Sequence, residues 1–354
     1  MKCCSVSTRP WPVDHLSCST YTYRISVLPS DYYSLWIRMK GPRVAFFGTP
    51  ILAKTCLAAL HKAFEVVLVV TNPDRECGRG KRARPNPVKE YALEHGINVY
   101  HETEGGLNLV SILRSEGVEL NVVVAYGRIL QGEIIEGPAF GSVNLHASLL
   151  PKYRGPSPIA AAILNGEKKT GVTLQKMHRR MDAGAVIVQL EIQIGEYDTA
   201  SDLLDKVMEV SPAFIVDGIQ KFISGAVRPR PQDEASATYC ALIRKQDGLI
   251  NWGSRSERIV NEIRAYNPWP VAYTFLDGKH LRIYRAVKCE ESFPTSARPG
   301  EIVDLRRGDG IVTVTGDGTI GILDLQLENK RKMGYREFAC GCRELVGKVL
   351  KKQR

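Results

Sequence analysis

Residues 43–70 read RVAFFGTPILAKTCLAALHKAFEVVLVV, and this stretch carries the pattern that predicts the fold. Residues 43–47 are apolar and typical of a buried strand, residues 53–63 have the composition of a helix, and residues 65–70 form a second apolar strand. Val-rich strands separated by helices are typical of a parallel sheet that is covered on both faces. The stretch therefore predicts an α/β fold.

The alternation of strands and helices continues toward the C-terminus. Helices are expected at residues 88–95 and 107–115, and strands at residues 97–100, 120–125 and 142–146. A long helical pattern follows at 199–224, where Pro212 is expected to interrupt the helix because proline lacks a backbone N–H. Residues 41–225 are thus predicted to form a doubly wound, Rossmann-like parallel sheet domain.

Residues 226–243 are predicted to be a linker, because the segment Arg228-Pro229-Arg230-Pro231 is stiff and polar. Beyond the linker the pattern changes to short strands, which are expected at residues 271–276, 280–289, 301–305, 310–315 and 319–327. Helices are expected before them at 254–266 and after them at 335–346. These short strands indicate a small, OB-like β-barrel domain over residues 244–354.

The composition excludes several classes of protein. With 44% hydrophobic and 24% charged residues, the chain of 354 residues is neither disordered nor a coiled coil. It contains no run of about eighteen apolar residues that could span a membrane. Its nine scattered cysteines, without a Cys-x-x-Cys pair, indicate reduced thiols rather than disulfides, and no metal site is expected.

The positive charge of the chain is concentrated toward the C-terminus. Residues 41–240 hold 22 basic and 22 acidic residues, whereas residues 241–354 hold 21 basic and 14 acidic residues. A neutral domain joined to a basic one suggests a small-molecule site beside a surface that binds a polyanion. The alternative is that these are ordinary solvated lysines and arginines on a protein of high pI.

Residues 1–40 lack hydrophobic periodicity and the apolar core of a signal peptide. They fit a flexible extension, an organelle transit segment, or sequence upstream of a true start at Met39, which lies shortly before the first strand. We favour the last interpretation, which predicts a bacterial cytoplasmic protein. A genuine transit segment would instead predict the mitochondrial matrix.

Two glycine-containing segments do not match nucleotide-binding motifs. Gly48-Thr49-Pro50 lacks the glycines of the dinucleotide fingerprint, although Thr49 is expected to cap the next helix and Pro50 suits its first turn. Residues 78–82, Gly-Arg-Gly-Lys-Arg, lack the Ser or Thr that follows the lysine of a phosphate-binding loop. NAD binding and ATP hydrolysis are therefore not expected.

A candidate active site lies at the end of the strand at 142–146. Asn144 and His146 face the same side, because side chains alternate along a strand, and open α/β sheets bind ligands at the carboxyl ends of their strands. An amide and an imidazole there can polarise a carbonyl group and stabilise an oxyanion. Asp182, just before another apolar strand, can hold or charge the histidine. Alternatively, the pair only satisfies loop backbone and Asp182 is a turn residue.

Several motifs resemble those of the formyltransferases that use formyl-tetrahydrofolate. The resemblance rests on Asn144-x-His146, Ser148-Leu149-Leu150-Pro151, Tyr153-Arg154-Gly155-Pro156 and Asp182, and it runs from about Met39 to the C-terminus. Residues 47–50, 72–82, 125–130 and the segment Tyr266-Asn267-Pro268-Trp269-Pro270 resemble the branch of that family that acts on methionyl-tRNA.

The resemblance implies transfer of a formyl group from 10-formyltetrahydrofolate to the α-amine of methionyl initiator tRNA, without a metal ion and without an obligate protein partner or a membrane. It implies that the catalytic residues are Asn144, His146 and Asp182, and that the residues receiving the folate are Ser148, Leu149, Leu150 and Pro151. Residues 72–89 are expected to form a mobile loop that contacts tRNA, together with the basic domain at 244–354. The tRNA contacts expected in this loop are Arg75, Arg79, Lys81, Arg82 and Arg84.

Two alternative functions remain. A related enzyme that formylates a small amine, or one that hydrolyses formyl-folate, would keep Asn144, His146 and Asp182 but would not need a basic second domain. A non-catalytic RNA-binding protein with a degenerate α/β half would be expected to have lost at least one of the three residues, and all three are present.

Overall fold

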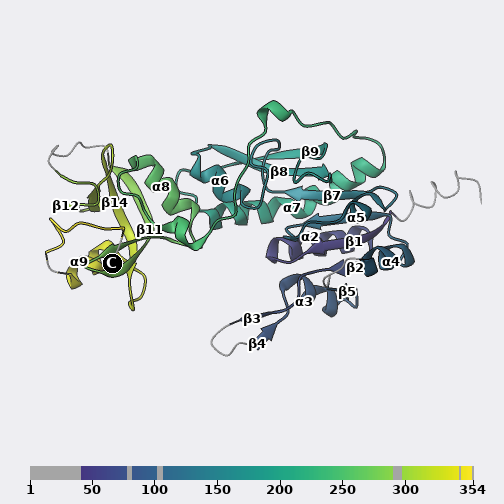
Figure 1. Cartoon of the computed structure of the whole chain (residues 1–354), viewed down its shortest axis with the longest axis horizontal. Helices are drawn as coiled ribbons and strands as arrows, with labels where there is room; N and C mark the ends of the chain where they lie inside the picture. Colours follow the sequence, from purple (N-terminus) through teal and green to yellow (C-terminus); the bar gives the residue numbers. More distant parts are fainter. Residues whose placement is uncertain (1–40, 78–81, 102–106, 290–296, 343, 353–354) are drawn as a thin grey trace, which may run out of the picture. The chain divides into compact units, whose positions relative to one another are not determined.

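The computed structural model describes residues 41–77, 82–101, 107–289, 297–342 and 344–352 (Figure 1). Within these residues the chain forms a mixed seven-stranded sheet covered by helices, followed by a separate antiparallel sheet. The α/β class with a small second β domain, predicted from the sequence, is confirmed. Among the described helices, none is both long enough and apolar enough to cross a membrane.

The first sheet has the strand order β5-β2-β1-β6-β7-β8-β9. Its first five strands pair in parallel, and β8 and β9 continue it in antiparallel fashion. The sequence did not predict the strand β8. The strands are β1 (Arg43–Gly48), β2 (Glu65–Val70), β5 (Asn98–Tyr100), β6 (Leu120–Val124), β7 (Ser142–His146), β8 (Lys169–Lys176) and β9 (Val186–Gln193).

Helices cover both faces of this sheet, which is why side chains on both faces of its central strands are buried. On β1, Val44 and Phe46 face one core, whereas Ala45 and Phe47 face the other. The first core is covered by α2, α3, α6 and α7, and the second by α4 and α5. The helices are α2 (Ile51–Ala63), α3 (Pro87–Glu94), α4 (Leu107–Ser115), α5 (Gly132–Glu136), α6 (Pro158–Leu164) and α7 (Ala200–Ile223).

Helices α2 and α7 each differ from the prediction in one respect. The N-cap of α2 is Pro50, and Thr49 makes no cap; its hydroxyl accepts a hydrogen bond from Asn72. Helix α7 runs without interruption through Pro212. Its buried face, which includes Val207 and Ile215, packs into the first core, and this packing outweighs the hydrogen bond that proline cannot make.

The long connection predicted at residues 72–89 contains a two-stranded ribbon. Its strands, β3 (Arg75–Cys77) and β4 (Arg82–Arg84), pair with each other and extend away from the main sheet (Figure 1). The base of the ribbon is anchored by Asn86, whose side chain caps α3 through Val88 N and Lys89 N. An ion pair of 2.7 Å between Lys89 and Asp74 adds a second anchor.

The second sheet has the order β10-β11-β14-β13-β12, with β15 paired to β14. Residues 347–351 link its two edge strands, because Lys351 exchanges hydrogen bonds with Phe275 of β10 while Gly347 and Lys348 bond to Ile302 of β12. This closure makes the domain barrel-like. Its strands are β10 (Ala272–Leu276), β11 (Lys279–Cys289), β12 (Ile302–Arg306), β13 (Gly310–Val314), β14 (Thr319–Leu327) and β15 (Met333–Gly334).

Among the described residues of the second domain, two segments form α-helices. Helix α8 (Ser256–Ala265) contributes Ile259 and Ile263 to the hydrophobic core of the second domain. This core is separate from the two cores of the first sheet. Helix α9 (Tyr335–Gly341) is shorter than the predicted 335–346, because the chain turns after Cys342 so that Leu345 and Leu350 can enter the same core.

Candidate functional site

The candidate site lies at the carboxyl end of β7, in the middle of the first sheet. Strand β7 is flanked by β6 and β8, and it carries Asn144 and His146 on one face. Asp182 lies in the connection between β8 and β9 with φ of +51°, a left-handed conformation that aspartate tolerates better than most residues. This conformation turns the carboxylate toward β7, so the three residues predicted from the sequence are brought together.

The Asp182 carboxylate is surrounded by hydrogen-bond donors. Its Oδ1 accepts from Gln175 Nε2 at 3.0 Å and from Asn144 Nδ2 at 3.3 Å. Its Oδ2 accepts from the backbone N–H of Gly155 at 2.9 Å. A carboxylate held by donors from three separate segments is fixed in position, because each contact restricts a different motion of the side chain.

The imidazole of His146 is 6% exposed and lies between two acceptors. Its Nε2 is 2.8 Å from the backbone carbonyl oxygen of Tyr153, and its Nδ1 is 3.6 Å from Asp182 Oδ2. Because a carbonyl oxygen can only accept, Nε2 carries the proton of that hydrogen bond. Nδ1 therefore faces the carboxylate and is the ring atom that can exchange a proton there.

This arrangement can perform acyl-transfer chemistry. The Asn144 amide has two N–H groups, of which one reaches Asp182, so the other can donate to an oxygen that gains negative charge. The His146 and Asp182 pair can accept and release a proton beside it. Within the described residues, no cluster of three or more His, Cys, Asp or Glu side chains could hold a metal ion.

The predicted folate loop, Ser148–Pro151, is used largely to build the fold. The Ser148 hydroxyl donates to Lys152 O at 2.6 Å and is fully buried. Leu150 is buried, and its backbone N–H and carbonyl oxygen bond to Thr173 and Gln189. Leu149 and Pro151 are only partly buried, so they are the members of the loop whose side chains remain available to a ligand.

A second set of strand ends meets at Asn72, directly after β2. Its Nδ2 donates to Thr49 Oγ1 and to Tyr126 O, both at 2.9 Å, and its Oδ1 accepts from Arg128 Nε at 2.7 Å. One side chain thus ties together the segments that follow β1, β2 and β6. Exposed Ile129, with 82% of its surface accessible, follows in the same loop after β6.

Three of the residues predicted to contact tRNA lie on the β3–β4 ribbon, which extends away from the main sheet (Figure 1). Arg75 and Arg82 lie on the strands of the β3–β4 ribbon, and Arg84 is exposed at its end. Arg79 and Lys81, which were predicted to contact the tRNA with them, lie outside the described residues.

The sequence interpretation missed the polar residues that surround Asn144, His146 and Asp182. Gln175 was not singled out, although it is buried on β8 directly opposite Asn144. Arg154 was quoted only as part of a motif, yet its guanidinium is 1% exposed and bonds to Gln232, Glu234 and Tyr239. The hydrogen bonds to Glu234 raise the pKa of Arg154 above its usual value. The sequence offered one signal that Arg154 is structurally important: it is an arginine two residues before a proline, in a predicted loop.

Comparison with protein families agrees with this geometry. A family model described as formyl transferase matches residues 42–219, and a model described as the formyl transferase C-terminal domain matches residues 242–343. The chain belongs to the formyl transferase family. The match of both models explains why a mixed α/β sheet and a small barrel-like domain occur in one chain.

Individual proteins that are similar to this chain give examples of named members of the family. A protein of Bacillus subtilis named methionyl-tRNA formyltransferase is 39% identical to this formyl transferase over 312 residues, which are 87% of this chain and 97% of that protein. An N-formyltransferase from Helicobacter canadensis, solved with folinic acid and dTDP-3-aminofucose, has a TM-score of 0.61 at 22% identity and covers 81% of this chain and 100% of its own.

A third similar protein is HypX from Aquifex aeolicus, solved with tetrahydrofolic acid. It has a TM-score of 0.54 at 18% identity, with 86% of this chain matching 48% of that one. At these identities the two solved structures show the shared fold of formyl transferases, and the substrates named in their descriptions are those of the other proteins.

Proposed function

We propose that the chain transfers a formyl group from 10-formyltetrahydrofolate to the α-amino group of the methionine carried by initiator tRNA, producing N-formylmethionyl-tRNA for the start of translation. The observation that carries the proposal is the cluster of Asn144, His146 and Asp182 at the carboxyl end of β7, in a chain that shares 39% identity with a methionyl-tRNA formyltransferase.

In the proposed reaction the three residues have different roles. Asn144 donates a hydrogen bond to the formyl oxygen as that oxygen gains negative charge, which lowers the barrier because the donor is already in place. The attacking amine must lose a proton. His146 and Asp182 receive it, directly or through a water molecule, with the proton arriving at Nδ1 or at the facing carboxylate oxygen. As the bond between the formyl carbon and N10 of the folate breaks, the same pair returns a proton to N10, and tetrahydrofolate leaves. No covalent enzyme intermediate is needed.

A folate-derived formyl donor fits the surroundings of the cluster. The donor supplies the formyl group, and the chain supplies apolar surface at the same sheet edge, from exposed Ile129 and from the partly buried Leu149 and Pro151. Ser148 and Leu150, which the sequence also assigned to the folate, support the shape of the loop from beneath.

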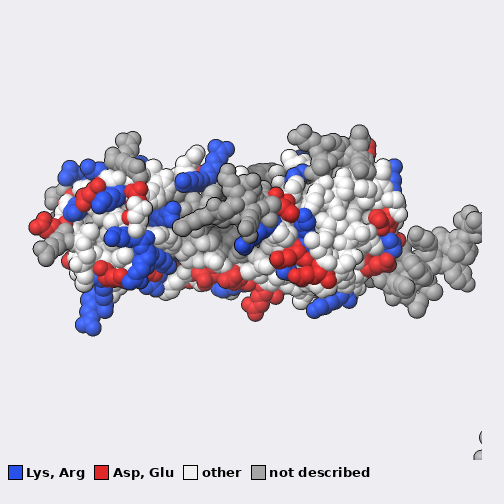
Figure 2. Space-filling view, turned by 90° about the horizontal axis from the view of Figure 1, so that it is seen from below, with Lys and Arg blue, Asp and Glu red and all other residues white. Residues whose placement is uncertain are grey.

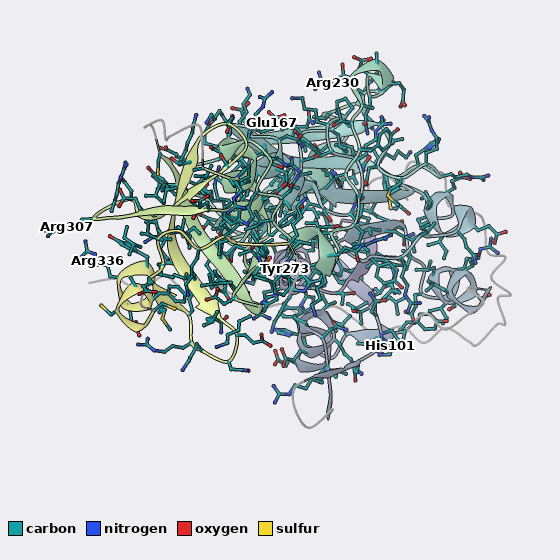
Figure 3. The ribbon with its side chains drawn as sticks, turned by 60° about the vertical axis from the view of Figure 1, so that its left-hand side comes forward. His101, Glu167, Arg230, Tyr273, Arg307 and Arg336 are labelled. Carbon is teal, nitrogen blue, oxygen red and sulfur yellow. The ribbon has the colours of Figure 1, made fainter. Side chains whose placement is uncertain are left out.

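We further propose a division of labour along the chain, with a catalytic domain at 41–225, a connecting segment at 226–243 and a tRNA-binding domain at 244–354. Figure 2 shows Lys and Arg side chains gathered on the C-terminal domain, at the left of the view. Figure 3 shows Arg307 and Arg336 at the outer edge of that domain, where phosphates have access to them. The β3–β4 ribbon is proposed as a second tRNA contact.

The test is to mix the purified protein with 10-formyltetrahydrofolate and methionyl initiator tRNA, and to measure acid-stable formyl-methionine. Two controls replace the tRNA by free methionine and by an amino sugar nucleotide. Formylation of the tRNA alone supports the proposal. Formylation of a small amine with comparable kcat/KM, or release of formate without any acceptor, would favour the alternative enzymes.

The proposed compartment is the bacterial cytoplasm, because the similar curated proteins are bacterial.

A further inference from the structure

The segment at residues 230–240, here named the strap, lies against the catalytic cluster although its sequence is typical of a linker. It begins where Arg230, labelled in Figure 3, exchanges two backbone hydrogen bonds of 2.8 Å with Val186 of β9. It ends beside Arg154, whose backbone N–H and carbonyl oxygen bond to Thr238 O and Cys240 N, also at 2.8 Å. The strap therefore connects the segment after Asp182 with the segment after His146.

Gln232 of the strap holds the backbone around Asp182. Its Nε2 donates to Asp182 O at 2.8 Å and to Gly184 O at 2.7 Å, and its Oε1 accepts from Arg154 Nε and Nη2 at 3.0 and 2.8 Å. The carbonyl oxygens only accept and the guanidinium only donates, so these partners fix the orientation of the amide. Gln232 thus supports the left-handed turn that aims the Asp182 carboxylate at His146.

Thr238 of the strap holds the other partner of the imidazole. Its hydroxyl oxygen accepts from the backbone N–H of Tyr153 at 2.8 Å. Tyr153 also has a left-handed φ of +59°, and its carbonyl oxygen is the atom that accepts from His146 Nε2. The strap consequently determines the positions of both acceptors between which the His146 ring lies.

The strap is itself fixed by a buried charge. Arg154 is 1% exposed and bonds both oxygens of Glu234, at 2.9 and 3.1 Å, while its Nη1 also reaches the Tyr239 hydroxyl at 3.2 Å. A buried guanidinium without these partners would be costly, so the strap is held on the cluster rather than lying free in solvent.

We propose that the strap is a positioning element of the formyl-transfer site, in which Gln232 and Thr238 are the positioning residues that fix Asp182 and the Tyr153 carbonyl on either side of His146. The inference rests on the proposed function. Neither residue touches a substrate. Both act by holding the imidazole and the carboxylate in the relative orientation that proton transfer needs.

The experiment compares three single variants with the full-length wild-type protein. Gln232→Glu keeps the side-chain oxygen that faces Arg154. It replaces the NH2 group, which donates to the carbonyl oxygens of Asp182 and Gly184, by an oxygen that cannot donate. Asp233→Asn is the matched control, because it makes the converse change at the next residue, whose side chain hydrogen-bonds to Ala235 and Ser236 of the strap itself. Thr238→Val removes the hydroxyl of an exposed residue, and Thr238→Ser restores it.

For Gln232→Glu we expect kcat to fall by about 10- to 100-fold, because misplacement of catalytic groups by ~1 Å has effects of this size. KM for tRNA and for the formyl donor should stay within about twofold of the wild type, since the strap does not bind either. Thr238→Val should lower kcat about fivefold, the worth of one hydrogen bond, and Thr238→Ser should restore it. Asp233→Asn should behave as the wild type.

A second measurement does not depend on activity. The ¹⁵N signals of the His146 ring report which nitrogen carries the proton, and we expect the wild type to carry it on Nε2. These signals should change in Gln232→Glu and Thr238→Val and stay unchanged in Asp233→Asn. The measurement also separates the two hypotheses: if the wild type formylates no tRNA, the proposed function fails, and the ring signals still decide whether the strap positions His146.

Two results would overturn the inference. One is wild-type kcat together with unchanged His146 signals in Gln232→Glu and Thr238→Val. The other is an equal loss of kcat in Asp233→Asn, which would mean that any change in the segment disturbs the site. If Gln232→Glu does not fold, the pair Thr238→Val and Thr238→Ser decides alone, because that side chain is at the surface.

Discussion

Substitution of Gly155 by alanine tests how tightly the strap must fit. Gly155 has φ of +120°, and its backbone N–H donates to Asp182 Oδ2 at 2.9 Å. A Cβ atom at this position would lie 2.3 Å from the carbonyl oxygen of Cys240, at the end of the strap, where ordinary contacts are 3.4–4 Å. Either Gly155 or the strap must therefore move by about 1 Å. A displacement of this size in a catalytic group is enough to lower the reaction rate strongly.

The expected magnitudes follow from this overlap. Overpacking of this kind costs about 1–3 kcal/mol, and a side chain at positive φ adds about 1 kcal/mol, so the free energy of unfolding should fall by roughly 2–4 kcal/mol. For a domain of this size the midpoint of thermal unfolding should fall by roughly 5–15 °C. Turnover should fall about a hundredfold at temperatures where the variant is fully folded, because the Asp182 carboxylate loses a fixed donor.

The assay is steady-state formylation of methionyl-tRNA at 25 °C, with thermal unfolding followed by circular dichroism. Gly225→Ala is the matched control: Gly225 also has positive φ, +75°, but no atom lies within 4 Å of its Cβ position. It should lose about 1 kcal/mol of stability and keep its turnover. Wild-type kcat in folded Gly155→Ala would refute the claim that the fit between strap and loop sets the geometry of the site.

Three further predictions concern other parts of the chain. The first concerns separate alanine variants of Asn144, His146 and Asp182. Each should lower turnover by about a hundredfold or more without loss of folding or tRNA binding. Near-normal turnover in one variant would remove that residue from the proposed site. Replacing Arg79, Lys81 and Arg82 together by alanine should raise KM for tRNA and reduce its salt dependence while KM for the formyl donor stays constant; unchanged tRNA kinetics would contradict a role in tRNA binding. Burial raises the pKa of the Cys56 thiol to about 12, so iodoacetamide at pH 8 should label exposed Cys340 before Cys56, which should react only on unfolding. Because an unfolded thiol ionises near pH 8.5, the stabilisation from burying Cys56 as a neutral thiol is complete below that pH and declines as the pH rises toward 12. Rapid labelling of Cys56 in the folded protein would contradict its burial.

The elements that the sequence predicted well have strong local signals. Strands β1 and β2 contain continuous apolar runs and β6 is apolar apart from Asn121, and the ends of β2 and β7 were predicted at the residues where the structure has them. Asn144 and His146 could be paired because strand alternation is a local rule. Asp182 was named as a possible partner of the histidine, with a turn residue as the alternative, and the resemblance to a family favoured the first, since no local rule relates two segments that lie 36 residues apart.

The elements that could not be predicted depend on contacts between distant residues. Strand β8 contains Lys169, Thr173 and Gln175, a polar composition that only becomes strand-like because β7 and β9 pair on either side of it. The strap resembles a linker because its prolines and charges favour solvent, yet Gln232 finds partners 50 and 78 residues away in the chain. Propensity describes neighbours in sequence, and these contacts are outside its range.

The strap also has a consequence for the newly made chain. The sheet, including β9, is complete in sequence by residue 193 and its covering helix α7 by Ile223, so the α/β half can begin to fold on the ribosome before the strap residues that contact its candidate site have emerged. Until Gln232 and Thr238 leave the exit tunnel, Asp182 and the Tyr153 carbonyl lack their supports. A nascent polypeptide would thus acquire its fold before its activity. For the same reason, a fragment cut at residue 219, where the first family match ends, would leave the buried Arg154 without the acidic and amide partners that hold it.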